Sequence, residues 1–99
     1  MSARLSDILS KLIGLSTADQ QPHTFVLKHG LVLMTHVQPT KFTLRIARTG
    51  QEPAYTEWKT VVAALPESYK PSTPVIPAMY QERQSLILSA SWQLPERLL

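Results

Sequence analysis

The stretch HTFVLKHGLVLMTHVQPTKFTLRIART, residues 23–49, decides the fold of this chain of 99 residues. It holds three runs rich in apolar, β-branched and aromatic residues, separated by His29-Gly30 and by Pro39-Thr40. Runs of this kind, divided by turn residues, are typical of consecutive antiparallel strands. We therefore predict a β-meander over residues 23–49, with strands near residues 23–28, 31–37 and 41–48.

The first hairpin of this meander carries apolar residues on both faces. With a two-residue turn at residues 29–30, the numbers of facing residues sum to 59. The predicted pairs are Phe25 with Met34 and Leu27 with Val32 on one face, and Val26 with Leu33 on the other. A sheet with one face in water alternates apolar and polar residues, whereas here both sides need a cover from a helix, a second copy or a partner.

The pairing of the third strand stays open. A two-residue turn at residues 39–40 puts Phe42 on the Val37 face, while a three-residue loop puts it with Phe25 and Met34. The two alternatives exchange which apolar side of the sheet is the core.

Amphipathic helices are predicted on either side of the meander. Residues 1–15 show the i, i+3, i+4, i+7, i+8 spacing of a helix, with Ser2 as N-cap and Gly14 as the stop. The apolar stripe of this helix consists of Leu5, Ile8, Leu9, Leu12 and Ile13. Pro53 suits the first turn of a second helix over residues 53–65, because its missing N–H has no helical partner there. The buried stripe of the second helix is predicted to consist of Tyr55, Trp58, Val62 and Leu65, with Val61 only as support.

The C-terminal part is predicted to cross the domain and then add one strand. Four prolines within residues 66–79 argue against a helix or a ladder there, so we expect an extended crossing. Residues 85–94 alternate in polarity, which predicts a strand with one buried face and one face in water. On the face in water, Ile87 is the one apolar residue. The order α-β-β-β-α-β indicates a single α+β domain over residues 1–99, with two helices packed on a four-stranded, mainly antiparallel sheet.

Composition and charge limit the class of protein. Hydrophobic residues make up 43% and charged residues 17% of the chain, which are globular proportions. The sequence shows neither a secretory pattern nor an apolar run of about 18 residues, so we expect a cytoplasmic protein without membrane association. It contains no cysteine, which excludes disulfides, thiolate catalysis and cysteine-ligated zinc.

The residues that could carry catalysis do not cluster along the sequence. The seven acidic residues stand at least five positions apart, and neither a G-x-S-x-G motif nor a glycine-rich phosphate loop occurs. We therefore predict that the protein is not an enzyme and uses no cofactor and no small-molecule substrate.

A pair of histidines comes nearest to a metal site. In the predicted register His23 lies opposite His36, with Cβ atoms roughly 4.5 to 5.5 Å apart. A stable site needs a third and usually a fourth ligand, and the sequence offers only Asp19 near the pair. Partly exposed surface histidines are the more common arrangement, so we expect no metal.

Protein association is the function that the apolar excess favours. We predict that the chain binds a protein partner, or a second copy as a homodimer, through a sheet face or through the first helix. The residues expected to carry this binding are Leu5, Leu9 and Leu12 in the helix, and Phe25, Leu27, Val32 and Met34 in the hairpin. The alternative is weak nucleic-acid binding, which the net charge of +3 favours. It would use the basic residues Lys28, Lys41, Arg45 and Arg48.

Overall fold

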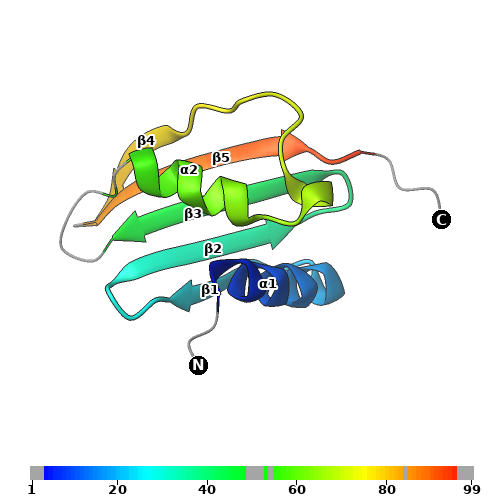
Figure 1. Cartoon of the computed structure of the whole chain (residues 1–99), viewed down its shortest axis with the longest axis horizontal. Coiled ribbons are helices and arrows are strands. Elements are labelled where there is room, and N and C mark those ends of the chain that lie inside the picture. Colours follow the sequence, from blue (N-terminus) through cyan, green and yellow to red (C-terminus); the bar gives the residue numbers. More distant parts are fainter. Residues whose placement is uncertain (1–3, 49–52, 54, 84, 96–99) are drawn as a thin grey trace.

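A computed structural model describes residues 4–48, 53, 55–83 and 85–95 of the chain (Figure 1). Its elements, in chain order, are helix α1 (Leu5–Asp19), strands β1 (His23–Val26), β2 (Leu31–Val37) and β3 (Lys41–Arg48), helix α2 (Tyr55–Ala64), the 3₁₀ turn η1 (Glu67–Tyr69), and strands β4 (Ala78–Glu82) and β5 (Ser85–Gln93). The strands form one antiparallel sheet in the order β1-β2-β3-β5-β4. The α+β class, with two helices and an antiparallel sheet, is therefore confirmed.

The sheet has five strands, one more than the sequence predicted. The additional strand, β4, begins directly after Pro77, at the end of the segment in which we expected only an extended crossing. It pairs with β5, and Arg83 in the connection has a left-handed φ of 57°. An edge strand needs ladder hydrogen bonds on one side only, so a short run with little alternation can still form one.

Both helices lie on the same side of the sheet. Figure 1 shows α1 along β1 and β2, and α2 in front of β3 and β5. The burial of the strand residues agrees with this one-sided cover. Buried residues alternate along each central strand and pair across the ladders, as Leu33, Ile46 and Leu88 do. The core therefore fills one side of the sheet, which we call the covered face.

The predicted register of the first hairpin is wrong by one residue. The observed pairs are His23 with Thr35, Thr24 with Met34, Phe25 with Leu33 and Val26 with Val32. The loop has three residues, since the Leu27 N–H donates to the Leu31 carbonyl (2.8 Å) and the Gly30 N–H donates to the Leu27 carbonyl (3.0 Å). Gly30 has a φ of 88°, the left-handed conformation that closes a three-residue hairpin loop as a bulge. The shift puts Phe25 on the covered face and Val26 on the opposite one.

The second turn has two residues, as in the first of the two alternatives. The Gln38 N–H donates to the Lys41 carbonyl (2.8 Å), and Val37 pairs with Phe42. Phe42 therefore lies on the Val37 side, where it is fully buried. Thr49, the predicted end of the meander, lies outside the described residues.

Helix α1 continues beyond its predicted end. It passes through Gly14 and stops at Gln20, which has the left-handed φ of 58° typical of a helix C-cap. Gly14 does not end the helix, because the next turn has a buried anchor: the Ser16 hydroxyl accepts a hydrogen bond from the Val37 N–H (2.8 Å). Ser2, the predicted N-cap, lies outside the described residues.

Helix α2 buries a different stripe from the predicted one. Trp58 and Val61 are buried, as is Leu65 just after the helix, whereas Tyr55 is 50% exposed and Val62 only partly buried. The buried positions follow an i, i+3, i+7 pattern, which turns Tyr55 toward the solvent. Among the described helices, none has both the length and the apolar character that a membrane crossing requires.

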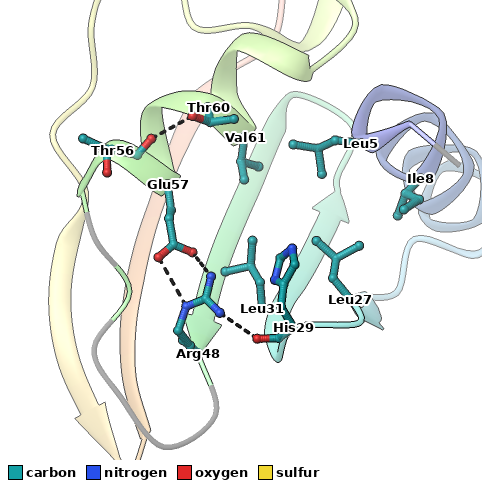
Figure 2. A pocket seen from close by; sticks show the side chains of 10 residues that line it. All are labelled: Leu5, Ile8, Leu27, His29, Leu31, Arg48, Thr56, Glu57, Thr60 and Val61. Carbon is teal, nitrogen blue, oxygen red and sulfur yellow. Dashed lines mark hydrogen bonds and ion pairs between the residues drawn. The ribbon is translucent and has the colours of Figure 1, made fainter. Parts of the chain in front are cut away.

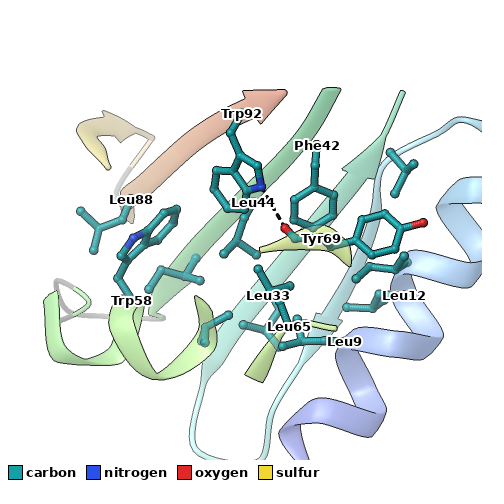
Figure 3. Packing of buried hydrophobic residues seen from close by; sticks show 14 of the residues in the cluster. Leu9, Leu12, Leu33, Phe42, Leu44, Trp58, Leu65, Tyr69, Leu88 and Trp92 are labelled. Carbon is teal, nitrogen blue, oxygen red and sulfur yellow. Dashed lines mark hydrogen bonds between the residues drawn. The ribbon is translucent and has the colours of Figure 1, made fainter. Parts of the chain in front are cut away.

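Aromatic rings join the C-terminal part of the chain to the core (Figure 3). Tyr69, in η1, packs on Phe42 with ring centroids 5.5 Å apart, and Phe42 lies 5.4 Å from the Trp92 ring. The Trp92 Nε1–H donates to the Tyr69 carbonyl (2.9 Å) in the buried interior. The proline-rich crossing thus contains one short 3₁₀ turn, which the prolines did not indicate, and a ring and a hydrogen bond anchor it to the sheet.

Candidate functional site

The side of the sheet opposite the helices, which we call the open face, lacks the cover that its apolar residues were expected to need. Side chains alternate along a strand, so every second residue of each strand faces this side. In the central strands these residues are Val32, Met34 and His36 in β2, Thr43, Arg45 and Ala47 in β3, and Ile87, Ser89 and Ser91 in β5. All of them are half-buried or exposed, and no described helix lies on them.

One row of the ladder crosses all five strands with apolar or aromatic side chains. We call this row the apolar strip, and its members pair in the order Val26, Val32, Ala47, Ile87 and Tyr80. Val26 is 59% exposed, and the other four side chains are half-buried. A contiguous apolar row on a surface, bordered by polar residues, marks an interaction site more often than scattered apolar residues do.

A hollow adjoins the apolar strip on the same face, and we call it the basic basin. It has a volume of about 480 Å³, and basic and hydroxyl side chains form much of its wall: Thr24, His36, Lys41, Thr43, Arg45 and Ser91. None of the residues that line it is acidic. The Thr43 and Ser91 hydroxyls share a hydrogen bond of 2.7 Å, so the floor of the hollow is polar. The chemistry of the basic basin suits an anionic group.

Arg45 and Tyr80 connect the basic basin to the apolar strip. The guanidinium carbon of Arg45 lies 5.7 Å from the centre of the Tyr80 ring, a cation–π distance that holds the cation above the end of the strip. The Tyr80 hydroxyl is buried and has no hydrogen-bond partner in the described chain. A buried donor without a partner costs free energy, so the Tyr80 hydroxyl is an unsatisfied group at this corner of the open face.

In a second pocket, on the covered face, the charged side chains are already paired with each other (Figure 2). It has a volume of about 410 Å³ and lies between α1, α2 and the first hairpin, with apolar walls that include Leu31 and Val61. At its polar end, Arg48 binds the Glu57 carboxylate through two nitrogens and donates from Nη1 to the His29 carbonyl (2.7 Å). Because these groups satisfy one another, the ion pair ties β3 to α2 and leaves little charge for a ligand.

The residues predicted to bind a partner do not form one surface. Four of the seven lie in the core or in the covered-face pocket: Leu5, Leu9, Leu12 and Leu27. Phe25 lies on the covered face at the edge of the sheet and is 43% exposed. Val32 and Met34 are the two that lie on the open face.

The four basic residues of the alternative prediction are also separated. Lys41 and Arg45 lie on the open face, and both are exposed. Lys28 lies in the loop of the first hairpin, and Arg48 lies on the covered face in its ion pair with Glu57. The sheet therefore brings two of the four cations together.

The predicted pairing of the two histidines is wrong, because the register shift places them on opposite faces. His23 pairs with Thr35, and its Nε2 lies 2.8 Å from the Asp19 carboxylate. His36 Nε2 donates to the carbonyl of the α1 C-cap residue (3.0 Å). The Gln21 N–H, and to a lesser extent His23, hold the pKa of Asp19 below its ordinary value. Within the described parts of the chain, no group of three metal-binding side chains occurs.

Sequence reasoning did not propose the C-terminal residues of the open face as site residues. Tyr80 lies in the strand that was not predicted, so nothing indicated which way its ring faces. Ile87 was the available signal, since it is the one apolar residue on the wet side of the last strand. With the observed ladder it lies between Ala47 and Tyr80 in the apolar strip.

Comparisons with protein-family models, with curated proteins and with solved structures found no match to this chain.

Proposed function

We propose that the chain is a non-catalytic interaction module that binds another protein through the open face of its sheet. The observation that carries this proposal is the placement of both helices on one side, which leaves the apolar strip half-exposed in the monomer. Burying apolar surface contributes about 25 cal/mol per Å², so a partner that covers five adjacent apolar side chains gains free energy from each.

The composition of the open face supports this proposal. Protein interfaces combine an apolar centre with a polar rim that supplies orientation and specificity. Here the apolar strip provides the apolar centre and the basic basin provides the polar rim, on one continuous sheet surface. The covered-face pocket is the weaker candidate, because Arg48 and Glu57 already neutralise each other there.

Nucleic-acid binding has less support from the geometry. Two cations of the open face, Lys41 and Arg45, could contact phosphates, but Arg48 is neutralised on the other face. Single-stranded nucleic acid also needs aromatic rings on which bases can stack, and the Tyr80 ring of the open face lies beneath Arg45.

A peptide selection tests the proposed function without a known partner. A random peptide library displayed on phage is panned against the immobilised chain, and synthetic copies of the enriched peptides are titrated by fluorescence anisotropy. We expect Ile87→Asp to weaken binding about tenfold or more, because it places a charge in the middle of the apolar strip. The matched control is Ile76→Asp, since Ile76 is 85% exposed in the crossing before β4 and lies outside the ladder.

Thermal unfolding of the two variants separates folding from binding. Both should unfold cooperatively near the wild-type temperature, because neither position is buried in the core. The proposal is overturned if no peptide is enriched, or if a folded Ile87→Asp variant binds the enriched peptides as tightly as Ile76→Asp does.

A further inference from the structure

We propose that the basic basin recognises an acidic segment of the partner in extended conformation, with two carboxylates over Lys41 and Arg45 and an apolar side chain on the apolar strip. This inference rests on the proposed function and adds the chemistry of the ligand. It follows from the charge of the basin, the spacing of its two cations and their position beside the strip.

The two cations lie on one strand at a fixed separation. Lys41 and Arg45 stand four residues apart on the same face of β3, so their backbone positions are roughly 13 Å apart at about 3.3 Å per residue. An extended peptide above the sheet has the same rise, and its residues i and i+4 point to the same side. Acidic residues at i and i+4 of such a peptide therefore match the cations without bending either backbone.

The residues between and beyond the cations fix the rest of the pattern. Thr43 lies between them, and its hydroxyl shares one hydrogen bond with the Ser91 hydroxyl. One O–H donor and the remaining oxygen lone pairs of this pair can still bind a small polar side chain of the peptide. Ala47 follows Arg45 on the same face and lies in the apolar strip between Val32 and Ile87. The matching peptide carries an acidic, a polar, an acidic and an apolar residue at alternate positions, read along β3.

Arg45 is prepared for this role by Tyr80. The ring restrains the guanidinium at 5.7 Å from its centre, while Arg45 itself stays exposed. A restrained arginine loses less side-chain entropy when it binds a carboxylate, and its planar donors can take both carboxylate oxygens. Within the described residues, no ion pair joins a carboxylate to Arg45 or Lys41, so both positive charges stay available to a ligand.

A second copy of the chain fits the basic basin less well. A copy packed over the basin with its own basin would bring cations against cations, since no acidic residue lines the hollow. Like charges placed across an interface suppress association, so the charge pattern favours a different, acidic partner.

The enriched peptides from the phage selection also test this inference. We expect them to carry Asp or Glu at i and i+4, and replacing these residues by Asn and Gln should weaken binding to the wild-type chain about tenfold or more. Double reversal of the basin cations, Lys41→Glu with Arg45→Glu, should cause a similar loss. It should also make the chain prefer peptides in which Lys replaces the two acidic residues. Lys11→Glu on the exposed side of α1 changes one charge away from the open face, and it should leave binding unchanged.

Three other outcomes would contradict the inference, each for a different reason. Peptides that lose binding with Ile87→Asp but not with the double reversal would leave the proposed function standing and overturn the acidic ligand. Tighter binding of single-stranded oligothymidine than of the acidic peptides, abolished by Arg45→Glu, would assign the basin to phosphates instead. A dimer that light scattering detects and that Ile87→Asp dissociates would assign the open face to a second copy.

Discussion

Gly30 fixes the register of the first hairpin, and with it the identity of the open face. Its φ of 88° is a backbone conformation that residues with a Cβ atom rarely adopt. We expect Gly30→Ala to lower the free energy of unfolding by about 1 kcal/mol or more, because the loop must strain or rearrange. Urea denaturation followed by circular dichroism measures this change.

Gly14 provides the matched control for Gly30. It lies inside α1 on an exposed side, and a Cβ added there meets nothing within 4 Å. Gly14→Ala should therefore raise the free energy of unfolding by about 0.5 to 1 kcal/mol, because alanine loses less entropy in a helix. Equal effects of the two substitutions would contradict the three-residue loop.

At the scale of elements, one buried hydroxyl joins the last turn of α1 to the end of β2. Ser16 donates to the Gln21 carbonyl (2.5 Å) and accepts from the Val37 N–H (2.8 Å). Ser16→Ala would leave that buried N–H without a partner, so we expect a loss of about 1 to 3 kcal/mol in the free energy of unfolding. Thr17→Ala is the control, since the Thr17 hydroxyl bonds only within the helix and its side chain is exposed. If Thr17→Ala costs as much, the tie is not specific to Ser16.

Periodic patterns predicted the elements whose burial is continuous. The alternation in β5 gave the correct buried face, and the apolar stripe of α1 placed Leu9 and Leu12 in the core. The pattern did not give the end of α1, because a hydrogen bond from another element outweighed the low helix propensity of Gly14. The pattern also misplaced the buried face of α2. It predicted Tyr55 and Val62 inside and Val61 only as support, whereas Val61 is buried and Tyr55 is exposed.

Turn length is the step at which sequence reasoning failed for the candidate site. The run Leu27 to Leu31 is compatible with a two-residue and with a three-residue loop, and both are common hairpin connections. One added loop residue exchanges the faces of the whole strand, so the composition of the open face depended on it. The fifth strand was missed for a different reason, since Pro77 precedes it and its five residues barely alternate.

At the scale of the whole molecule, the chain is a two-layer structure in which a single sheet carries two helices on one side. Its core is complete on that side, where the aromatic residues of η1, β3 and β5 pack together. The other side combines the apolar strip and the basic basin on a surface that the described chain leaves to the solvent. We propose that this side serves as the binding surface for a partner.

Thiol labelling can show whether a bound peptide covers this side, because the chain contains no cysteine and each introduced thiol reports one position. The reporter is Ser91→Cys, at an exposed position of the open face, and the control is Ser6→Cys, at an exposed position of α1. Without peptide, both thiols should react with a maleimide at comparable rates. An enriched peptide at saturation should slow the reaction at position 91 about tenfold or more and leave position 6 unchanged. Protection at position 91 in the free monomer, or equal rates with and without bound peptide, would show that the open face is not the binding surface.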